Sequence, residues 1–434
     1  MTIEDPLILV IISFLALFAL LAIGVHIAIA LAMVGVIGFF VFQGSAGLAA
    51  LVPFRTLDSF ILTAIPLFIF MGEILVQCGA SDMIYRGASR LLAWLPGGLF
   101  HSNIGACAMF AAISGSSPAT AATIGTVAIP ALKKRGYDTH ITLGSLAAGG
   151  TLGILIPPSI NMIVYGVLAE ESIGRLFAGG VIPGLILSGM FMTYIAIRSV
   201  RNKRQAPKEM TLSIRGVVLS FLDLWPLFVL AIVVLGGIFG GFMTPTEAAA
   251  IGSSASLVIA VVLRRFNWAL LKGSLASSLE TTCMVLFIVT GASIMASFFS
   301  RAGIPMAVSQ LIAGAGVSRW IVLIAIYAIY VFLGCFIDPL SIIVMTAATV
   351  LPIIEQLGFD PIWFGVVYVV TAETGMITPP MGLNLFVIQG ISREDLAKVI
   401  TGSMPFFLIM LVGLALFTAL PSLVLWLPNL LFGS

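Results

Sequence analysis

Two proline-centred sequences decide the fold of this chain: Gly153-Ile-Leu-Ile-Pro157-Pro158-Ser-Ile-Asn161 and Gly375-Met-Ile-Thr-Pro379-Pro380-Met-Gly-Leu-Asn384. The second follows the first by 222 residues at the glycine and at both prolines (375 − 153 = 222), and only the spacing to the asparagine differs, by one residue. Proline lacks the backbone N–H that continues a helix, so each pair interrupts an apolar segment. Matched interruptions in two halves of a membrane chain indicate a transporter built from internal repeats.

The same offset of 222 residues recurs outside these two sequences. The further matched pairs are Pro130/Pro352, Gly136/Gly358, Asp138/Asp360, Gly180/Gly402 and Pro183/Pro405. A constant offset over this much of the chain predicts two equivalent halves and not two unrelated kinks.

The composition predicts an all-α polytopic membrane protein. The 434 residues are 60% hydrophobic and 9% charged, whereas soluble domains have about 25% charged residues. Each helical crossing takes about 20 apolar residues, which leaves room for about ten crossings. The first apolar run follows Glu4-Asp5 and not a basic stretch, so we expect a retained helix and no cleaved signal peptide. A net charge of +2 argues against a nucleic-acid role.

The first repeat is expected over residues 1–197. It begins with scaffold helices within residues 1–77, and a broken helix over residues 139–169 precedes its last span, Leu176 to Ile197. Between them, residues 102–132 form two apolar arms that meet at Gly115-Ser116-Ser117-Pro118. Each arm is too short to cross the bilayer comfortably, so we predict a re-entrant helical hairpin whose tip is shielded by protein.

The second repeat is expected over residues 217–434, with scaffold helices within residues 217–263. A second hairpin over residues 320–354 has its tip at Asp338-Pro339, and a second broken helix follows over residues 364–391. Glu247 follows Thr244 at the capping-box spacing, so it is interpreted as a helix cap and not as a site residue.

The charges predict that the repeats are inverted. The loop of residues 198–216 between the repeats is strongly basic, which places it in the cytoplasm. The basic cluster Lys133-Lys134-Arg135 corresponds to Glu355-Gln356-Leu357 (133 + 222 = 355), so equivalent points have opposite charge bias. Counting crossings from the basic loop places Lys133 inside, Glu355 outside and both chain termini in the periplasm. In this scheme Arg301 and Arg319 lie on the periplasmic side, contrary to the positive-inside rule.

Four backbone breaks, two in the hairpins and two in the broken helices, are expected to converge near the middle of the membrane. Ser117-Pro118 and Asp338-Pro339 each place an N-cap side chain before a proline, which predicts two helix starts there. Such helix ends attract anions, and carbonyl oxygens of unwound backbone bind sodium. The alternative for any single break is a simple kink or a close-packing site. No lysine or arginine lies within the breaks.

Two acids are expected within the membrane, where ionisable groups are costly and usually functional. Asp338 is a candidate sodium ligand, or only a helix cap. Glu373 can bind sodium, take up a proton or bond to neighbouring backbone. His26, His101 and His140 lie near predicted membrane borders, and the four cysteines contain no CxxC pair. We find no motif of a hydrolytic or redox site and therefore expect no enzyme and no cofactor.

Several longer sequences resemble one family, the DctM-like large membrane subunit of tripartite ATP-independent periplasmic (TRAP) transporters. They are Ser114-Gly-Ser-Ser-Pro-Ala-Thr-Ala-Ala-Thr-Ile-Gly125, Gly150-Thr-Leu-Gly-Ile-Leu-Ile-Pro-Pro-Ser-Ile160, Ile377-Thr-Pro-Pro-Met-Gly-Leu-Asn-Leu-Phe386, Ala64-Ile-Pro-Leu-Phe68 and Phe359-Asp-Pro-Ile-Trp-Phe364.

The resemblance implies an elevator-type secondary transporter of the bacterial inner membrane, with a mobile transport domain and a static scaffold. It also implies uptake of an organic acid by symport with two or more sodium ions. A periplasmic binding protein would deliver the solute. A small four-helix membrane subunit would widen the scaffold, and we expect it to be a separate polypeptide.

The resemblance also implies site residues. The first sodium site is Ser114, Gly115, Ser116 and the interrupted strand from Gly153 to Pro157. The second is Gly334, Asp338, Gly375, Thr378 and Met381. The substrate site is Ser117, Thr120, Asn161, Pro380 and Asn384.

The sequence leaves the solute open. The hairpin and break motifs resemble the C4-dicarboxylate branch more than the sialic acid, keto acid, sugar acid or ectoine-like branches. The nearest rival function is a stand-alone sodium/dicarboxylate symporter of related inverted-hairpin design. A channel is disfavoured because two hairpins close the predicted site.

Overall fold

The computed structural model describes residues 6–43, 47–202, 213–314 and 316–433, and these residues form helices and loops without a strand. The elements are α1 (Pro6–Ala22), α2 (Ile27–Gln43), α3 (Gly47–Leu57), the 3-10 helix η1 (Phe60–Thr63), α4 (Ala64–Gln77), α5 (Ala80–Leu92), α6 (Leu99–Ser114), α7 (Ser117–Lys134), α8 (Thr139–Leu155), α9 (Ile160–Leu168), α10 (Ile173–Arg201), α11 (Ile214–Phe239), α12 (Pro245–Val262), α13 (Trp268–Arg301), α14 (Ile304–Gly314), α15 (Arg319–Gly334), α16 (Pro339–Gln356), α17 (Pro361–Met376), α18 (Leu383–Ser392), α19 (Leu396–Ala419) and α20 (Ser422–Phe432).

The helices confirm a multi-pass membrane protein. Among the described residues, seven helices are long and apolar enough to cross a bilayer, and α8 with α9 adds an eighth span that is bent by 42°. Much of the predicted basic loop, including Lys203, Arg204 and Lys208, lies outside the described residues, as does Glu4-Asp5.

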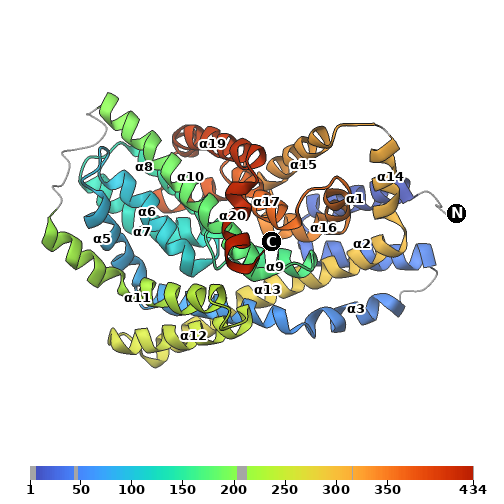
Figure 1. The fold of residues 1–434 in the computed structure, drawn as a ribbon, viewed down its shortest axis with the longest axis horizontal. Coiled ribbons are helices and arrows are strands. Elements are labelled where there is room, and N and C mark those ends of the chain that lie inside the picture. The colour runs from blue at the N-terminus through green and yellow to red at the C-terminus, as the bar shows by residue number, and fades with distance from the viewer. Residues whose placement is uncertain (1–5, 44–46, 203–212, 315, 434) are drawn as a thin grey trace.

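Each half contains a helical hairpin followed by a broken helix. In the first half, α6 and α7 form the hairpin and α8 and α9 the broken helix; in the second half, α15 and α16 are followed by α17 and α18. The hairpins and broken helices pack together, and α7 contacts α8 and α18 while α16 contacts α17 and α9. Figure 1 shows the first hairpin at one end of the long axis and the second toward the other.

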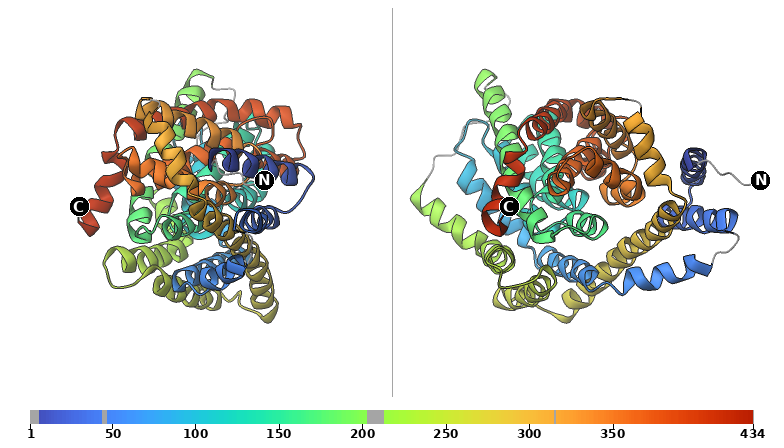
Figure 2. Two further views of the ribbon diagram at one scale, coloured as in Figure 1. Left: turned by 90° about the vertical axis from the view of Figure 1, so that its right-hand side faces the viewer. Right: turned by 45° about the vertical axis from the view of Figure 1, so that its right-hand side comes forward.

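A second group of helices borders this bundle. The helices α2, α3 and α4 pack against the long α13, and α4 also packs against α12, which contacts α11. Figure 1 shows α11, α12, α13 and α3 along one edge of the molecule, with α10, α19 and α15 along the opposite edge. In the right-hand view of Figure 2, α13 runs between α2 and α3 and the bundle of hairpins.

The two halves have opposite orientations. Glu355 and Asp360 act electrostatically on Glu171, just before α10 begins. Arg198, in the last turn of α10, lines a pocket together with Asp138, which follows the Lys133 cluster. The two groups lie near opposite ends of α10, a helix of 29 residues that is about 43 Å long at the usual rise per residue. The matched positions 133 and 355 therefore lie near opposite ends of the molecule, as inverted repeats require.

Glycine allows α8 and α19 to pack backbone against backbone. A Cβ atom on Gly144 would lie 2.0 Å from the Gly402 carbonyl oxygen, and one on Gly402 would lie 2.1 Å from the His140 carbonyl oxygen. Small residues at such contacts are the usual means of close helix packing in membranes. A side chain at either glycine could fit only if one of the two helices shifted.

Replacing Gly402 by alanine is therefore expected to lower stability by about 1–3 kcal/mol through overpacking. The matched control is Gly390→Ala, because a Cβ atom on Gly390 would meet no heavy atom within 4 Å. Thermal unfolding of the two purified variants in detergent checks the expectation: Gly402→Ala should unfold several degrees lower than Gly390→Ala. Equal unfolding temperatures would contradict this packing.

Candidate functional site

Three oxygen atoms converge at the tip of the first hairpin. The Ser114 hydroxyl lies 2.6 Å from the Thr120 hydroxyl, and the Thr120 hydroxyl donates to the Ser116 carbonyl oxygen at 2.8 Å. Gly153 of the first broken helix faces this group, since a Cβ atom there would lie 2.6 Å from the Ser116 carbonyl oxygen and 2.7 Å from Thr120 Oγ1. The predicted first-site residues Ser114, Ser116 and Gly153 are thus in contact.

The hairpin tip also touches the first break. Gly115 has a φ of +57°, and a Cβ atom on it would lie 3.2 Å from the Pro158 carbonyl oxygen. Its conformation and its surroundings both favour glycine. Pro157 beside it is buried. The peptide bond between Pro157 and Pro158 is cis, as is that between Pro379 and Pro380.

The helix start at this tip differs from the sequence prediction by one residue. Ser116, and not Ser117, is the N-cap of α7, and its side chain accepts a hydrogen bond from the Ala119 N–H. Ser117 lies at the first helical position and Pro118 at the second. Both serines suit a cap by type, but only Ser116 has the extended backbone that a cap requires.

The second hairpin tip repeats this arrangement. Asp338 is the N-cap of α16, as predicted, and its carboxylate accepts from the Ser341 N–H at 3.0 Å and from the Ser341 hydroxyl. Gly334 and Gly375 bring the hairpin and α17 into backbone contact, because a Cβ atom on Gly375 would lie 2.6 Å from Gly334 Cα. The Gly382 N–H donates to the Cys335 carbonyl oxygen at 2.8 Å, which joins the tip to the second break.

The two breaks differ in their exposure. The first, around Pro157 and Ser159, is buried, whereas Pro380 and Met381 of the second are exposed. Thr378 is half-buried, and its hydroxyl donates to the Thr374 carbonyl oxygen at 2.6 Å. The second predicted sodium site is therefore split between a buried contact at Gly334 and Gly375 and an open turn.

One side chain joins the two halves. Asn384 of α18 is fully buried, and its amide donates to the Ser117 hydroxyl at 2.8 Å and to the Ala147 carbonyl oxygen at 3.2 Å. Its carbonyl oxygen has no partner. Thr120 is buried on the same hairpin arm. Asn161 lies on α9, which packs against α16, whereas Asn384 lies on α18, which packs against α7.

A buried carboxylate lies beside this junction. Glu373 of α17 is 0% exposed, and the side chain of Ser117 is close to it. Neither carboxylate oxygen has a hydrogen bond of acceptable geometry. Such a group is unusual, because buried polar atoms are nearly always paired.

Sequence reasoning missed the tyrosines that support the second hairpin. The fully buried Tyr368 donates its hydroxyl to the Pro339 carbonyl oxygen at the start of α16. Its ring lies 6.3 Å from that of Tyr165 and 5.3 Å from that of Tyr330, measured between centroids. A buried phenol usually finds a partner, so tyrosines inside apolar spans are a signal that the sequence offers.

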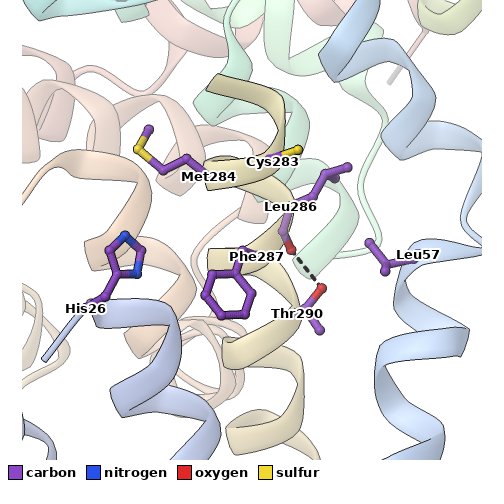
Figure 3. A pocket seen from close by; sticks show the side chains of 7 residues that line it. All are labelled: His26, Leu57, Cys283, Met284, Leu286, Phe287 and Thr290. Atoms are coloured by element: carbon purple, nitrogen blue, oxygen red, sulfur yellow. Dashed lines mark hydrogen bonds between the residues drawn. The ribbon is translucent and has the colours of Figure 1, made fainter. Parts of the chain in front are cut away.

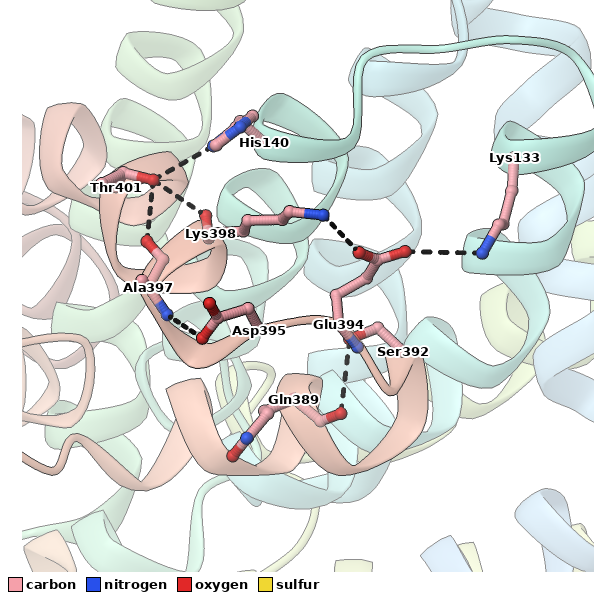
Figure 4. Close-up of polar contacts among 9 residues, drawn as sticks. All are labelled: Lys133, His140, Gln389, Ser392, Glu394, Asp395, Ala397, Lys398 and Thr401. Carbon is pink, nitrogen blue, oxygen red and sulfur yellow. Dashed lines mark hydrogen bonds and ion pairs between the residues drawn. The ribbon is translucent and has the colours of Figure 1, made fainter.

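Charged side chains join the two halves at one end of the molecule. Glu394 pairs with Lys398 at 2.8 Å and with Lys133, at the end of α7, at 3.4 Å. Hydrogen bonds from Lys398, and next from Lys133, hold the pKa of Glu394 below its usual range. His140 lies 3.0 Å from the Thr401 hydroxyl. Figure 4 shows these contacts linking the first hairpin to the loop between α18 and α19.

A separate apolar cavity of about 590 Å³ lies among α2, α3 and α13. Figure 3 shows its lining residues, among them His26, Leu57, Cys283 and Phe287. None of the residues that line it belongs to a hairpin or a broken helix. Within the described chain, no group of three or more His, Cys, Asp or Glu side chains is placed to hold a metal ion.

Comparison with known proteins now identifies the family. The family model described as "Tripartite ATP-independent periplasmic transporter, DctM component" matches residues 14–423. The chain belongs to this family. The C4-dicarboxylate TRAP transporter large permease protein DctM of Vibrio cholerae is 35% identical over 97% of each chain. The predicted family membership is thereby confirmed.

Two further similarities concern length and fold. The isethionate TRAP transporter permease protein DctMQ of Oleidesulfovibrio alaskensis is 36% identical, with 96% of this chain and 66% of that relative covered. The solved structure of the Alcanivorax borkumensis YdaH transporter is also similar to this chain, with a TM-score of 0.55 and 16% sequence identity. The match covers 86% of this chain and 90% of the YdaH chain. At that identity, the similarity concerns the fold alone.

The Asn384 contact predicts that Asn384→Leu will destabilise the TRAP permease. The substitution removes two buried hydrogen bonds and leaves the Ala147 carbonyl oxygen without this partner, a loss of about 1–3 kcal/mol. The control is Gln389→Leu, which removes a half-buried amide from the same helix. A lower unfolding temperature for Asn384→Leu than for Gln389→Leu is expected, and the reverse order would refute the role of this contact.

Proposed function

We propose that this TRAP permease imports a small organic acid, with C4-dicarboxylates favoured, by sodium symport after delivery from a periplasmic binding protein. The observation that carries the proposal is the matched pair of hairpin tips, each in backbone contact with the break of its own half. The two tips and two breaks supply both kinds of group that the co-transport of an anion and sodium needs.

Sodium would bind to the oxygen atoms at the tips. Hard cations prefer oxygen ligands, and hydroxyl and backbone carbonyl oxygens suit sodium. For one ion, the Ser114 hydroxyl and the Ser116 carbonyl oxygen supply such ligands, with Gly115, Gly153 and Pro157 around them. The hydroxyl of Thr120, predicted for the substrate site, contacts both oxygens. Gly334, Asp338, Gly375 and Thr378 supply the second, with Met381 at its exposed edge.

The anion would bind at the helix starts. The N-termini of α7 and α16 lie at the two tips, and each carries a partial positive charge. No basic side chain lies within the breaks, so these helix ends, hydroxyl groups such as Ser117 and co-bound sodium would have to neutralise the cargo.

Movement of the hairpin bundle would carry the cargo across the membrane. The helices of the hairpins and broken helices form the proposed transport domain. The proposed scaffold is α1 to α4, α11 and α12, which cover the predicted ranges 1–77 and 217–263, together with α13, which packs against α2, α3 and α4. The scaffold touches the bundle where α13 meets α16 and where α4 meets α6 and α9. We infer an elevator-type mechanism, with sliding along these contacts.

Two partners are part of the proposal. The family is described as tripartite and periplasmic, and the isethionate relative, named DctMQ, is longer than this chain. We infer that a small membrane subunit, of four helices by family resemblance, binds the scaffold and that a periplasmic protein delivers the solute.

The choice of solute affects the driving force. A dianion with two sodium ions moves no net charge, whereas a monoanion with two sodium ions moves one. Each net charge gains ~2.3 kcal/mol per 100 mV of membrane potential. The C4-dicarboxylate and isethionate relatives are similarly distant from this chain, at 35% and 36% identity, so solute identity needs a direct assay.

Reconstituted transport tests the proposal. The permease, its small membrane subunit and the binding protein are placed together in proteoliposomes, and uptake of radiolabelled succinate is measured with a sodium or a potassium gradient. Uptake that needs both sodium and the binding protein is expected. Sodium-driven uptake by this subunit alone would favour the stand-alone symporter, and succinate uptake that ignores sodium would contradict the proposal.

The same assay tests the sodium sites through Asp338→Asn and Ser116→Ala. Ser116→Ala removes the side-chain cap that positions the oxygens of the first tip, whereas Asp338→Asn keeps a capping residue but removes the carboxylate charge from the second. For each variant we expect the half-maximal sodium concentration to rise about tenfold, equivalent to ~1.4 kcal/mol. Asp395→Asn is the control, because Asp395 also caps a helix but lies outside the breaks. Unchanged sodium dependence in both tip variants would rule out these sites.

A further inference from the structure

Glu373 has a buried carboxyl group, and no cationic side chain of the described chain pairs with it to balance the charge of its ionised form. It is 0% exposed, and neither oxygen has a hydrogen-bond partner. The ion pairs found between described side chains have Asp223 or Glu394 as the acid, and not Glu373. An uncompensated buried carboxylate is very costly, and the cost falls when a cation binds to it.

Ser117 connects Glu373 to Asn384, because its side chain is close to Glu373 and its hydroxyl accepts from the Asn384 amide. Asn384 already uses both amide N–H groups, toward Ser117 and Ala147, and its carbonyl oxygen has no partner although it is buried. The Ser117 oxygen accepts one of these bonds and keeps a second lone pair. Ser117 lies beside Glu373, so one junction contains three kinds of oxygen ligand.

We propose that Glu373, Asn384 and Ser117 bind a third sodium ion, separate from the two at the hairpin tips. The proposal rests on the proposed sodium symport. Oxygen-only ligands that include a carboxylate suit a hard cation, and the bound ion would balance the charge of Glu373 and occupy the free lone pairs of Asn384.

The proposed third site occurs in the second half of the chain and has no equivalent in the first half. The position that corresponds to Glu373 in the first half is Thr151 (373 − 222 = 151). Thr151 brings no carboxylate, and its hydroxyl is already bonded to the Ala148 carbonyl oxygen at 2.6 Å. The third site therefore breaks the symmetry of the two tip sites.

The location of the site predicts an order of events. Ser117 also belongs to the proposed substrate site, so an ionised Glu373 without a cation would repel an anionic cargo there. Sodium binding at Glu373 should therefore precede cargo binding. With a dianion and three sodium ions, each cycle would move one net positive charge inward, and the membrane potential would drive uptake.

The test compares Glu373→Gln with wild type in the complete reconstituted transporter. Uptake of ²²Na⁺ and of radiolabelled succinate is measured together, with and without an inside-negative potential set by potassium and valinomycin. We expect the variant to carry one sodium ion fewer per succinate and to lose the acceleration by voltage. Glu355→Gln, the same change at an exposed glutamate of α16, should retain the wild-type ratio.

A second measurement tests the site even if Glu373→Gln folds poorly. Equilibrium binding of ²²Na⁺ to the detergent-purified permease, scaled to folded protein, should give one bound ion fewer for Glu373→Gln than for wild type and for Glu373→Asp, which keeps the carboxylate. An equal sodium count in wild type and Glu373→Gln overturns the third site alone. Sodium-independent transport by wild type would instead remove the proposed function.

Discussion

The whole structure depends on one constraint: backbone groups freed inside a membrane must find partners within the protein. The breaks free such groups at four places, and protein groups meet them there. The Gly382 N–H bonds to the Cys335 carbonyl oxygen, and the Ser116 carbonyl oxygen accepts from Thr120. Each hairpin tip must therefore lie against the break of its own half, and this contact creates the proposed pocket.

Glycine makes these contacts possible, and a few polar side chains make them specific. Gly153 and Gly375, at matched positions, each face a hairpin at distances that exclude a side chain. The halves are then joined by the buried Asn384 and by Lys133 with Glu394 at one end. The first contact links the proposed cargo site to both halves, so the proposed function would couple occupancy of this site to the packing of the bundle.

The sequence predicted the elements that depend on local chemistry. The offset of 222 residues, the proline pairs and the Asp338 cap all follow from residue type and spacing. The contacts between residues far apart in the sequence could not be predicted in this way. A repeat offset shows which positions of the two halves are equivalent, but not which residues touch. The Tyr368 bond to Pro339 and the junction of Asn384 with Ser117 needed the folded chain. The cap at Ser116 was displaced by one residue because adjacent serines are chemically alike.

The central claim is that the two halves are inverted and enclose one site, and labelling of matched positions tests it most directly. Lys134 and Glu355 are both exposed. Each is replaced singly by cysteine, in a background in which the exposed Cys283 is serine, and treated in cells and in inverted vesicles with a membrane-impermeant maleimide. The account predicts labelling of Lys134→Cys from the cytoplasm and of Glu355→Cys from the periplasm. Labelling of both from the same side would contradict it.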